Sequence, residues 1–258
     1  MTNDFHSREL PRRVVVTGGS SGIGLAVASF FLGLGASVGI IGRDNSRLGA
    51  AASGLRRSAP DRIHTRPADV RNEEMLGKAI DELAETLGGI DVLVAAAGEE
   101  GEMGAACEDV TAGSFRNVLD TNVTGTFLAV RAALPYLKQA EQSSIVIIGS
   151  DSGFVAVPGM LAYNASKGAL VQLTRALAVE LFDAHGIRVN SVCPSIVDTP
   201  MARRGLGVES FADAEYPVHD PQDIAWSVGY LSSPRSRTVN GVNLISDFGY
   251  TARSSFPA

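Results

Sequence analysis

The feature that most constrains the fold is a short β-branched run that ends in a glycine-rich turn and leads into a helix. Val14, Val15 and Val16 precede the segment 17–24, T-G-G-S-S-G-I-G, and apolar residues then recur at helical spacing from Gly22 to Leu34. In such a turn backbone N–H groups can approach a pyrophosphate, and the positive end of the helix favours the anion. The segment predicts a dinucleotide-binding unit; the alternative is a turn that only closes the strand–helix connection.

The same alternation of strand and helix continues along the chain. Further strands are predicted at Ser37–Ile41, Ile63–Thr65, Asp91–Val94, Ile145–Ile148 and Ile187–Val192, and further helices at Asn45–Arg57, Asn72–Leu87, Thr111–Leu137 and Leu161–Ala184. Strands that are apolar throughout are typical of a parallel sheet covered on both faces. We expect a doubly wound α/β sheet in three α/β/α layers, forming one domain over residues 1–258. The long stretch Pro200–Asp220 lacks clear periodicity, which predicts a lid over a substrate site.

Composition narrows the function classes. The chain has 22 Lys+Arg and 28 Asp+Glu, a net charge of −6, so nucleic acid is not expected as a partner. The two cysteines and four histidines show no metal-ligand spacing, and we expect no metal site and no disulfide framework. The sequence has no apolar run of the ~18 to 20 residues that cross a bilayer, and its first residues do not resemble a signal peptide. These features predict a cytoplasmic protein without a membrane partner.

A second motif carries candidate chemistry. Tyr163 and Lys167 stand four residues apart on a predicted helix and share a face, and Ser150 ends an apolar strand thirteen residues before the tyrosine. An ammonium beside a phenol favours the phenolate and lowers its pKa from ~10, which would make an acid/base usable near neutrality. A surface Tyr/Lys pair is the usual alternative for this spacing alone. The glycine turn and Ser150 favour the catalytic interpretation.

Taken together, these motifs resemble the short-chain dehydrogenase/reductase family, in its single-domain branch. The resemblance runs from Val14 to Thr251 and includes Asn122 in D-T-N-V-T-G and the tail S-D-F-G-Y-T. It implies a Rossmann-like fold and an NAD(P)-dependent oxidoreductase that interconverts a secondary alcohol and a ketone. By the same resemblance, Tyr163 is the acid/base, Ser150 binds the substrate oxygen, Lys167 lowers the tyrosine pKa and holds the nicotinamide ribose, and Asn122 positions a water.

The resemblance also assigns a cofactor site. Besides Tyr163 and Lys167, the expected cofactor-binding residues are Gly18, Ser20, Ser21, Gly22, Ile23, Gly24, Arg43, Asp69, Val70, Ala96, Ala97, Gly98, Pro194, Val197 and Thr199. Two segments depart from the family's pattern: A-A-A-G at 95–98 stands for N-N-A-G, and Pro194-Ser195 stands for P-G. The first removes asparagine hydrogen bonds, and the second places a hydroxyl where backbone usually nears the nicotinamide.

Cofactor choice follows from the end of the second strand. Gly42 stands where the family's NAD enzymes usually carry an acidic residue, and Arg43 follows with a guanidinium suited to phosphate. NADP(H) is therefore expected in preference to NAD(H), which stays possible. Asp44 either reaches the ribose or caps the next helix, and we favour the cap.

The remaining expectations concern partners. The resemblance implies a homo-oligomer, a tetramer, and a small-molecule alcohol or ketone as substrate. Arg203 and Arg204 in the predicted lid either bind an acidic substrate or are solvated. Asp151 and Ser152 either support Ser150 or cap a turn. A non-catalytic dinucleotide-binding regulator is the alternative function, but the four polar catalytic positions argue against it, and chain length and glycine spacing disfavour an epimerase or dehydratase.

Overall fold

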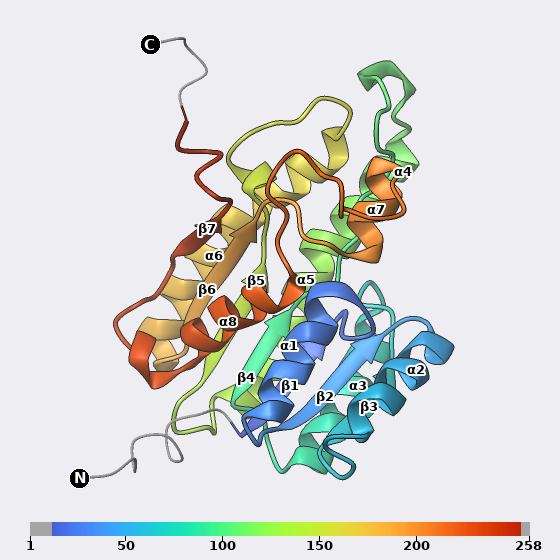
Figure 1. Cartoon of the computed structure of the whole chain (residues 1–258). Coiled ribbons are helices and arrows are strands. Elements are labelled where there is room, and N and C mark those ends of the chain that lie inside the picture. The colour runs from blue at the N-terminus through green and yellow to red at the C-terminus, as the bar shows by residue number, and fades with distance from the viewer. Residues whose placement is uncertain (1–11, 254–258) are drawn as a thin grey trace, which may run out of the picture.

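Seven parallel strands form the centre of the molecule in the computed structural model, which describes residues 12–253. The strand order is β3-β2-β1-β4-β5-β6-β7. The strands are β1 (Arg13–Thr17), β2 (Ser37–Gly42), β3 (Ile63–Pro67), β4 (Val92–Ala95), β5 (Ser144–Ile148), β6 (Arg188–Pro194) and β7 (Asn243–Ser246). Because all neighbouring pairs are parallel, the carboxyl ends of the strands meet at one edge, toward the top of Figure 1. The predicted doubly wound sheet is confirmed.

Helices cover both faces of the sheet. One layer contains α1 (Gly22–Gly33), α2 (Asn45–Arg56) and α8 (Pro221–Ser232), and the other contains α3 (Glu73–Leu87), α5 (Gly125–Leu137) and α6 (Leu161–His185). The core divides the same way: Val14 and Val16 face α1 and α8, whereas Val15 faces α3 and α5. Strands of this kind bury alternate residues in opposite cores, which explains why their sequences are apolar at successive positions.

The long helix predicted over Thr111–Leu137 is interrupted. The structure has α4 (Ala112–Leu119), a π-helical turn at Asp120–Thr124, and then α5. The extra residue in a π turn shifts the register of the following helix, and such turns often mark functional positions. The interruption places Asn122 in the turn, with its side chain fully buried.

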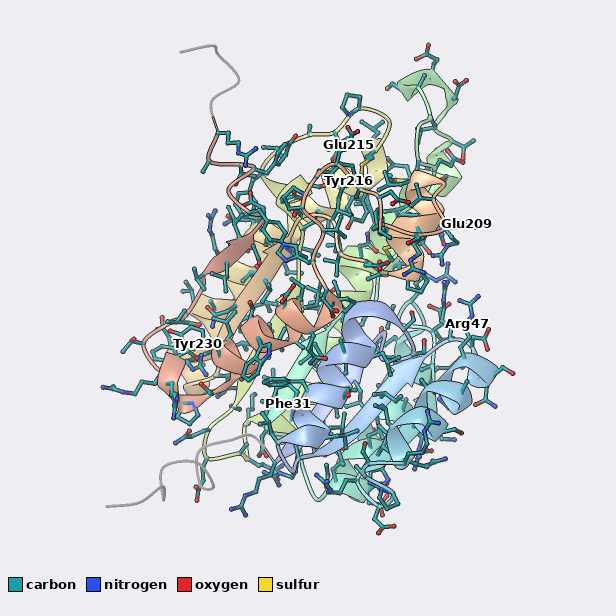
Figure 2. All side chains as sticks on the ribbon, viewed as in Figure 1. Phe31, Arg47, Glu209, Glu215, Tyr216 and Tyr230 are labelled. Atoms are coloured by element: carbon teal, nitrogen blue, oxygen red, sulfur yellow. The ribbon has the colours of Figure 1, made fainter. Side chains whose placement is uncertain are left out.

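The predicted lid segment contains a short helix. Pro200–Leu206 forms α7, capped at its start by Thr199 and ended by Gly207 in the left-handed conformation, and residues 207–220 lead from it to α8. Figure 2 shows the side chains of Glu209, Glu215 and Tyr216 along that connection, above the carboxyl edge of the sheet. Proline at the first helical position and a left-handed glycine after the last are ordinary helix boundaries, which periodicity over only seven residues could not reveal.

Neither membrane-spanning helices nor metal-ligand clusters occur in the part of the chain that the structure describes. Within residues 12–253 no helix is long and apolar enough to cross a bilayer. The same residues contain no group of three or more His, Cys, Asp or Glu side chains that could hold a metal ion. Both cysteines are free thiols, Cys107 on the surface and Cys193 in the interior.

Candidate active site

The glycine turn after β1 requires glycine for steric reasons. A Cβ on Gly18, whose φ is +69°, would lie 2.7 Å from the carbonyl oxygen of Ala96, and one on Gly24 would lie 2.3 Å from the carbonyl oxygen of Gly18. The turn therefore packs directly against the segment after β4. A Cβ on Gly22 would meet the side chain of Thr199 at 3.0 Å. Three segments that the sequence assigns to the cofactor thus lie side by side at the carboxyl edge.

The N-terminus of α1 is available to an anion. Among the described residues, side chains cap α2, α3, α4, α7 and α8 (Asp44, Asn72, Thr111, Thr199 and Asp220), whereas α1, like α5 and α6, has no side-chain cap and no acidic residue in its first turn. The first N–H groups of a helix need acceptors, and phosphate oxygens supply them. The turn and the open helix end therefore fit the pyrophosphate of a dinucleotide.

Ser150, Tyr163 and Lys167 gather at the end of β5. Ser150 follows this strand, and the first turns of α6 carry Tyr163 and Lys167 on one face, with the ammonium nitrogen of Lys167 5.4 Å from the centre of the tyrosine ring. Lys167 is buried, and its Nζ donates a hydrogen bond to the carbonyl oxygen of Ile148 at 3.0 Å. The i, i+4 spacing read from the sequence holds in the structure.

Burial dominates the pKa values of the tyrosine and the lysine. Desolvation raises the pKa of Tyr163 to about 12, although a hydrogen bond with Ser150 favours the phenolate. Desolvation also lowers the pKa of Lys167 to about 8. The shift of Tyr163 is opposite to the one expected from its pairing with Lys167, because the cost of burying the phenolate exceeds the stabilisation from the surrounding side chains.

Asn122 ties two distant segments together beside this group. Its Nδ2 donates to the carbonyl oxygen of Glu99 at 3.0 Å and to Ser166 Oγ at 2.9 Å, and its Oδ1 accepts from the Glu99 N–H at 2.8 Å. Ser166 in turn donates to the carbonyl oxygen of Tyr163. The buried amide therefore fixes the segment after β4 against the helix that carries the tyrosine. This positioning contact was not foreseen from the sequence.

Arg43 and Asp44 follow β2, and of the two only Asp44 is engaged in capping a helix. Asp44 accepts from the Arg47 N–H at 3.0 Å and caps α2, as favoured from the sequence. Arg43 is half exposed, and its Nη1 lies 3.9 Å from the Glu99 carboxylate. Burial raises the pKa of Glu99 despite the nearby charges of Arg43 and Arg71. Glu99, which the sequence did not single out, is thus the carboxylate that faces Arg43.

The other expected cofactor residues lie along the same edge. Asp69 follows β3 and is bound by Arg71, which lowers the pKa of its carboxyl. The Ala97 N–H donates to Thr17 Oγ1 at 3.3 Å. Pro194 ends β6, Val197 pairs in a bridge with His219, and the remaining expected residues lie in the same segments.

The two arginines of the predicted lid are paired within the chain. Arg203 makes two hydrogen bonds to Asp198, at 2.6 and 2.8 Å, and Arg204 reaches Glu100 at 3.0 Å. The second pair links α7 to the segment after β4. Both arginines are exposed but paired, and an acidic substrate would have to displace one of these carboxylates.

Comparison with known proteins identifies the family. The family model for short chain dehydrogenases matches residues 12–206. Two proteins of Xanthobacter autotrophicus are each 36% identical: 2-(S)-hydroxypropyl-CoM dehydrogenase 3, aligned over 93% of this chain and 96% of its own length, and 2-(R)-hydroxypropyl-CoM dehydrogenase, aligned over 94% and 100%. Among solved structures, a 3-ketoacyl-(acyl-carrier-protein) reductase from Brucella melitensis complexed with NADH has a TM-score of 0.83 at 29% identity. An actinorhodin polyketide ketoreductase variant with NADPH has the same score at 30% identity; both alignments cover 92% of this chain and 97% of the other.

The chain therefore belongs to the short-chain dehydrogenase family. It is an NAD(P)-dependent oxidoreductase that interconverts a secondary alcohol and a ketone. The comparisons give no support to the alternative of a non-catalytic regulator.

Proposed function

We propose that Tyr163 is the acid/base of this reaction, with Ser150 and Lys167 as its partners and NADP(H) as the preferred cofactor. The observation that carries the proposal is the cluster at the end of β5: Ser150 bonds the phenol of Tyr163, and the buried ammonium of Lys167 lies one helical turn away. When bound, the nicotinamide ring exchanges a hydride with the carbon of the substrate. The protein has to orient the substrate and move one proton.

Each polar side chain then has one task. Tyr163 gives its phenolic proton to the carbonyl oxygen in reduction and takes the alcohol proton in oxidation. Lys167 holds the ribose and supplies positive charge that counteracts the burial of the phenolate. Asn122 keeps the segment after β4 in place and, as the family resemblance implies, positions a water. Residues 200–220 close over a small alcohol or ketone as the substrate lid.

Tyr163→Phe tests this assignment. The variant keeps the ring and removes the proton, so we expect turnover to fall by on the order of 10³-fold, about 4 kcal/mol, with nearly unchanged cofactor affinity. Turnover is measured by cofactor absorbance on an alcohol–ketone pair found by screening, and affinity by fluorescence titration. Tyr136→Phe is the matched control, because that tyrosine on α5 bonds Asp81 away from the site. Full activity of the Tyr163 variant would overturn the proposal.

The NADP(H) preference is supported by Arg43, by the missing side chain at Gly42 and by the commitment of Asp44 to the helix cap. A charge-assisted contact to phosphate contributes about 1.5 to 3 kcal/mol, which corresponds to a preference on the order of 10- to 100-fold in kcat/KM. The Glu99 carboxylate opposes this preference, because phosphate has to replace it beside Arg43.

Arg43→Ala should erase the preference. Arg47→Ala is its control: Arg47 is also exposed and lies on α2, as Figure 2 shows. The values of kcat/KM for NADP(H) and NAD(H) are compared on one substrate. An unchanged ratio in the Arg43 variant, or a wild-type preference for NAD(H), would contradict the assignment.

A further inference from the structure

His219 is a buried side chain that the proposed reaction does not use. It lies at the end of the connection from α7 to α8 and is only 5% exposed. Its Nε2 lies 2.8 Å from the carbonyl oxygen of Ser246, which ends β7. A carbonyl oxygen can only accept a hydrogen bond, so Nε2 carries the hydrogen and donates it. The imidazole therefore joins the end of the predicted lid to the C-terminal strand.

The same carbonyl group also holds the segment that follows β6. The Ser195 N–H donates to the Ser246 carbonyl oxygen at 3.0 Å, so both lone pairs of this oxygen are in use. The backbone of His219 is bonded to the next residues: its N–H donates to the Ile196 carbonyl oxygen, and its carbonyl oxygen accepts from the Asp198 N–H, each at 2.9 Å. The segment after β6 is therefore held between β7 and His219, and the imidazole links these two supports.

Phe248 supports the imidazole from the C-terminal side. Its ring stacks on the ring of His219, with the centroids 4.2 Å apart and the planes 25° from parallel. The φ of Phe248 is +54°, the only positive value at a non-glycine residue in the part of the chain that the structure describes. Such backbone is unfavourable for a residue with a side chain and persists only where its surroundings fix it. Here the stack fixes the turn together with the Asp247 carboxylate, which accepts from two backbone N–H groups.

The family resemblance places the nicotinamide beside the segment that begins at Pro194 and Ser195. We propose that His219 is a positioning residue: its Nε2–H bond to Ser246 holds residues 195–198 where the nicotinamide half of the cofactor needs them. The inference rests on the proposed function for the place of the cofactor. The adenosine half is expected at the glycine turn and the end of β2, and the hydrogen bonds of His219 are to other segments.

Loss of this bond acts on one half of the cofactor. Without the Nε2–H donor, residues 195–198 keep their backbone bonds, but the two segments that hold them are no longer joined. The nicotinamide then has to order the segment as it binds, and this ordering weakens binding. A single hydrogen bond of this kind changes an equilibrium constant by up to about ten-fold. The adenosine half needs no such ordering.

Titration calorimetry with the whole cofactor and with its nicotinamide-free part tests the inference. The two ligands are NADPH and 2′-phospho-ADP-ribose, or NADH and ADP-ribose if the wild type prefers NADH. His219→Phe keeps a ring that can stack on Phe248 and removes the donor. We expect Kd for the whole cofactor to rise by about ten-fold and Kd for the nicotinamide-free ligand to stay within about two-fold of the wild type.

His219→Gln is the conservative variant, because its side-chain N–H can donate near the position of Nε2, and it should recover most of the lost affinity. His185→Phe is the matched control: His185 is exposed at the opposite end of α6 from Tyr163, and both Kd values should stay unchanged. Equal weakening of the two ligands by His219→Phe would indicate a general effect on the fold. That result, an unchanged Kd for the whole cofactor, or no recovery in His219→Gln would overturn the inference.

Nuclear magnetic resonance of the wild type covers the case in which His219→Phe does not fold. In protein labelled with ¹⁵N-histidine, His219 is identified among the four histidines as the signal absent from His219→Gln. Its Nε2 should carry the hydrogen, and its signal should move with the whole cofactor but not with the nicotinamide-free ligand. An Nε2 without a hydrogen, or the same response to both ligands, contradicts the proposal. Neither experiment uses substrate or turnover, so both stand whether or not Tyr163 is the acid/base.

Discussion

Replacement of Arg188 should destabilise the fold more than replacement of an exposed arginine. Arg188 begins β6, is only 8% exposed, and donates to four acceptors in the segment that ends α8: Leu231 O at 2.9 Å, Ser236 Oγ at 3.1 Å, Ser233 O at 3.2 Å and Val239 O at 3.3 Å. Burial lowers the pKa of its guanidinium, because removing the charged group from water is unfavourable. The arginine thus supplies donors to carbonyl groups at the negative end of a helix.

The size of the effect follows from these acceptors. Arg188→Met keeps an apolar stem of similar shape and removes four hydrogen bonds from a charged donor, each of which contributes about 1.5 to 3 kcal/mol. Because the four belong to one network and Ser236 also bonds Leu231 and Ser233, the costs do not add. We expect a total loss of about 3 to 5 kcal/mol. For a chain of this size that lowers Tm by roughly 6 to 20 °C.

Thermal and urea unfolding measure this loss. Arg175→Met on α6 is the control, because its side chain is exposed and makes a single 3.5 Å contact with Gln172, and it should stay within about 0.5 kcal/mol of the wild type. Arg188→Lys should fall between the two, since an ammonium keeps the charge but cannot reproduce the planar fork of donors. If Arg188→Met and Arg175→Met unfold within about 1 kcal/mol of each other, the network does not stabilise the packing of α8 on β6.

Two further predictions concern the glycine turn and assembly. Gly18→Ala should destabilise the protein by about 1 to 3 kcal/mol and weaken cofactor binding, since the φ of Gly18 is +69° and a Cβ would meet Ala96. Gly33→Ala is the control in the same unfolding assay. Gly33 lies at the end of α1, where a Cβ would have no atom within 4 Å, so the change should be neutral or slightly stabilising. We also propose a homotetramer, supported by exposed apolar side chains on α5, α6 and α8, namely Phe127, Val179, Phe182, Trp226 and Tyr230. Sedimentation at micromolar concentration should give four times the mass of the chain, and a clean monomer would exclude it.

The central strands could be located from sequence because their burial is two-sided. The predicted runs Val14–Val16 and Ser37–Ile41 lie within β1 and β2, which extend only one or two residues beyond them. The edge strand β7, Asn243–Ser246, had no predicted boundaries. Its residues are only partly buried or exposed, so its sequence carries no continuous apolar run. The other edge strand, β3, begins with the buried Ile63 and was predicted, so the sequence missed only the short and partly exposed strand β7.

In the candidate site, the sequence predicted the local contacts and missed the long-range ones. Tyr163 and Lys167 lie one turn apart, so helical spacing alone placed them on one face. The contacts of Asn122 with Glu99 and Ser166 span 23 and 44 residues, and no local pattern encodes them. Apolar periodicity through residues 111–137 predicted one continuous helix. The structure has a π turn at Asp120–Thr124, which keeps the apolar periodicity on either side of it. The turn buries the Asn122 amide between β4 and α6. Burying the Asn122 amide costs little free energy only where its three hydrogen-bond partners are already in position. The π turn that interrupts the helix therefore depends on tertiary contacts and not on local sequence.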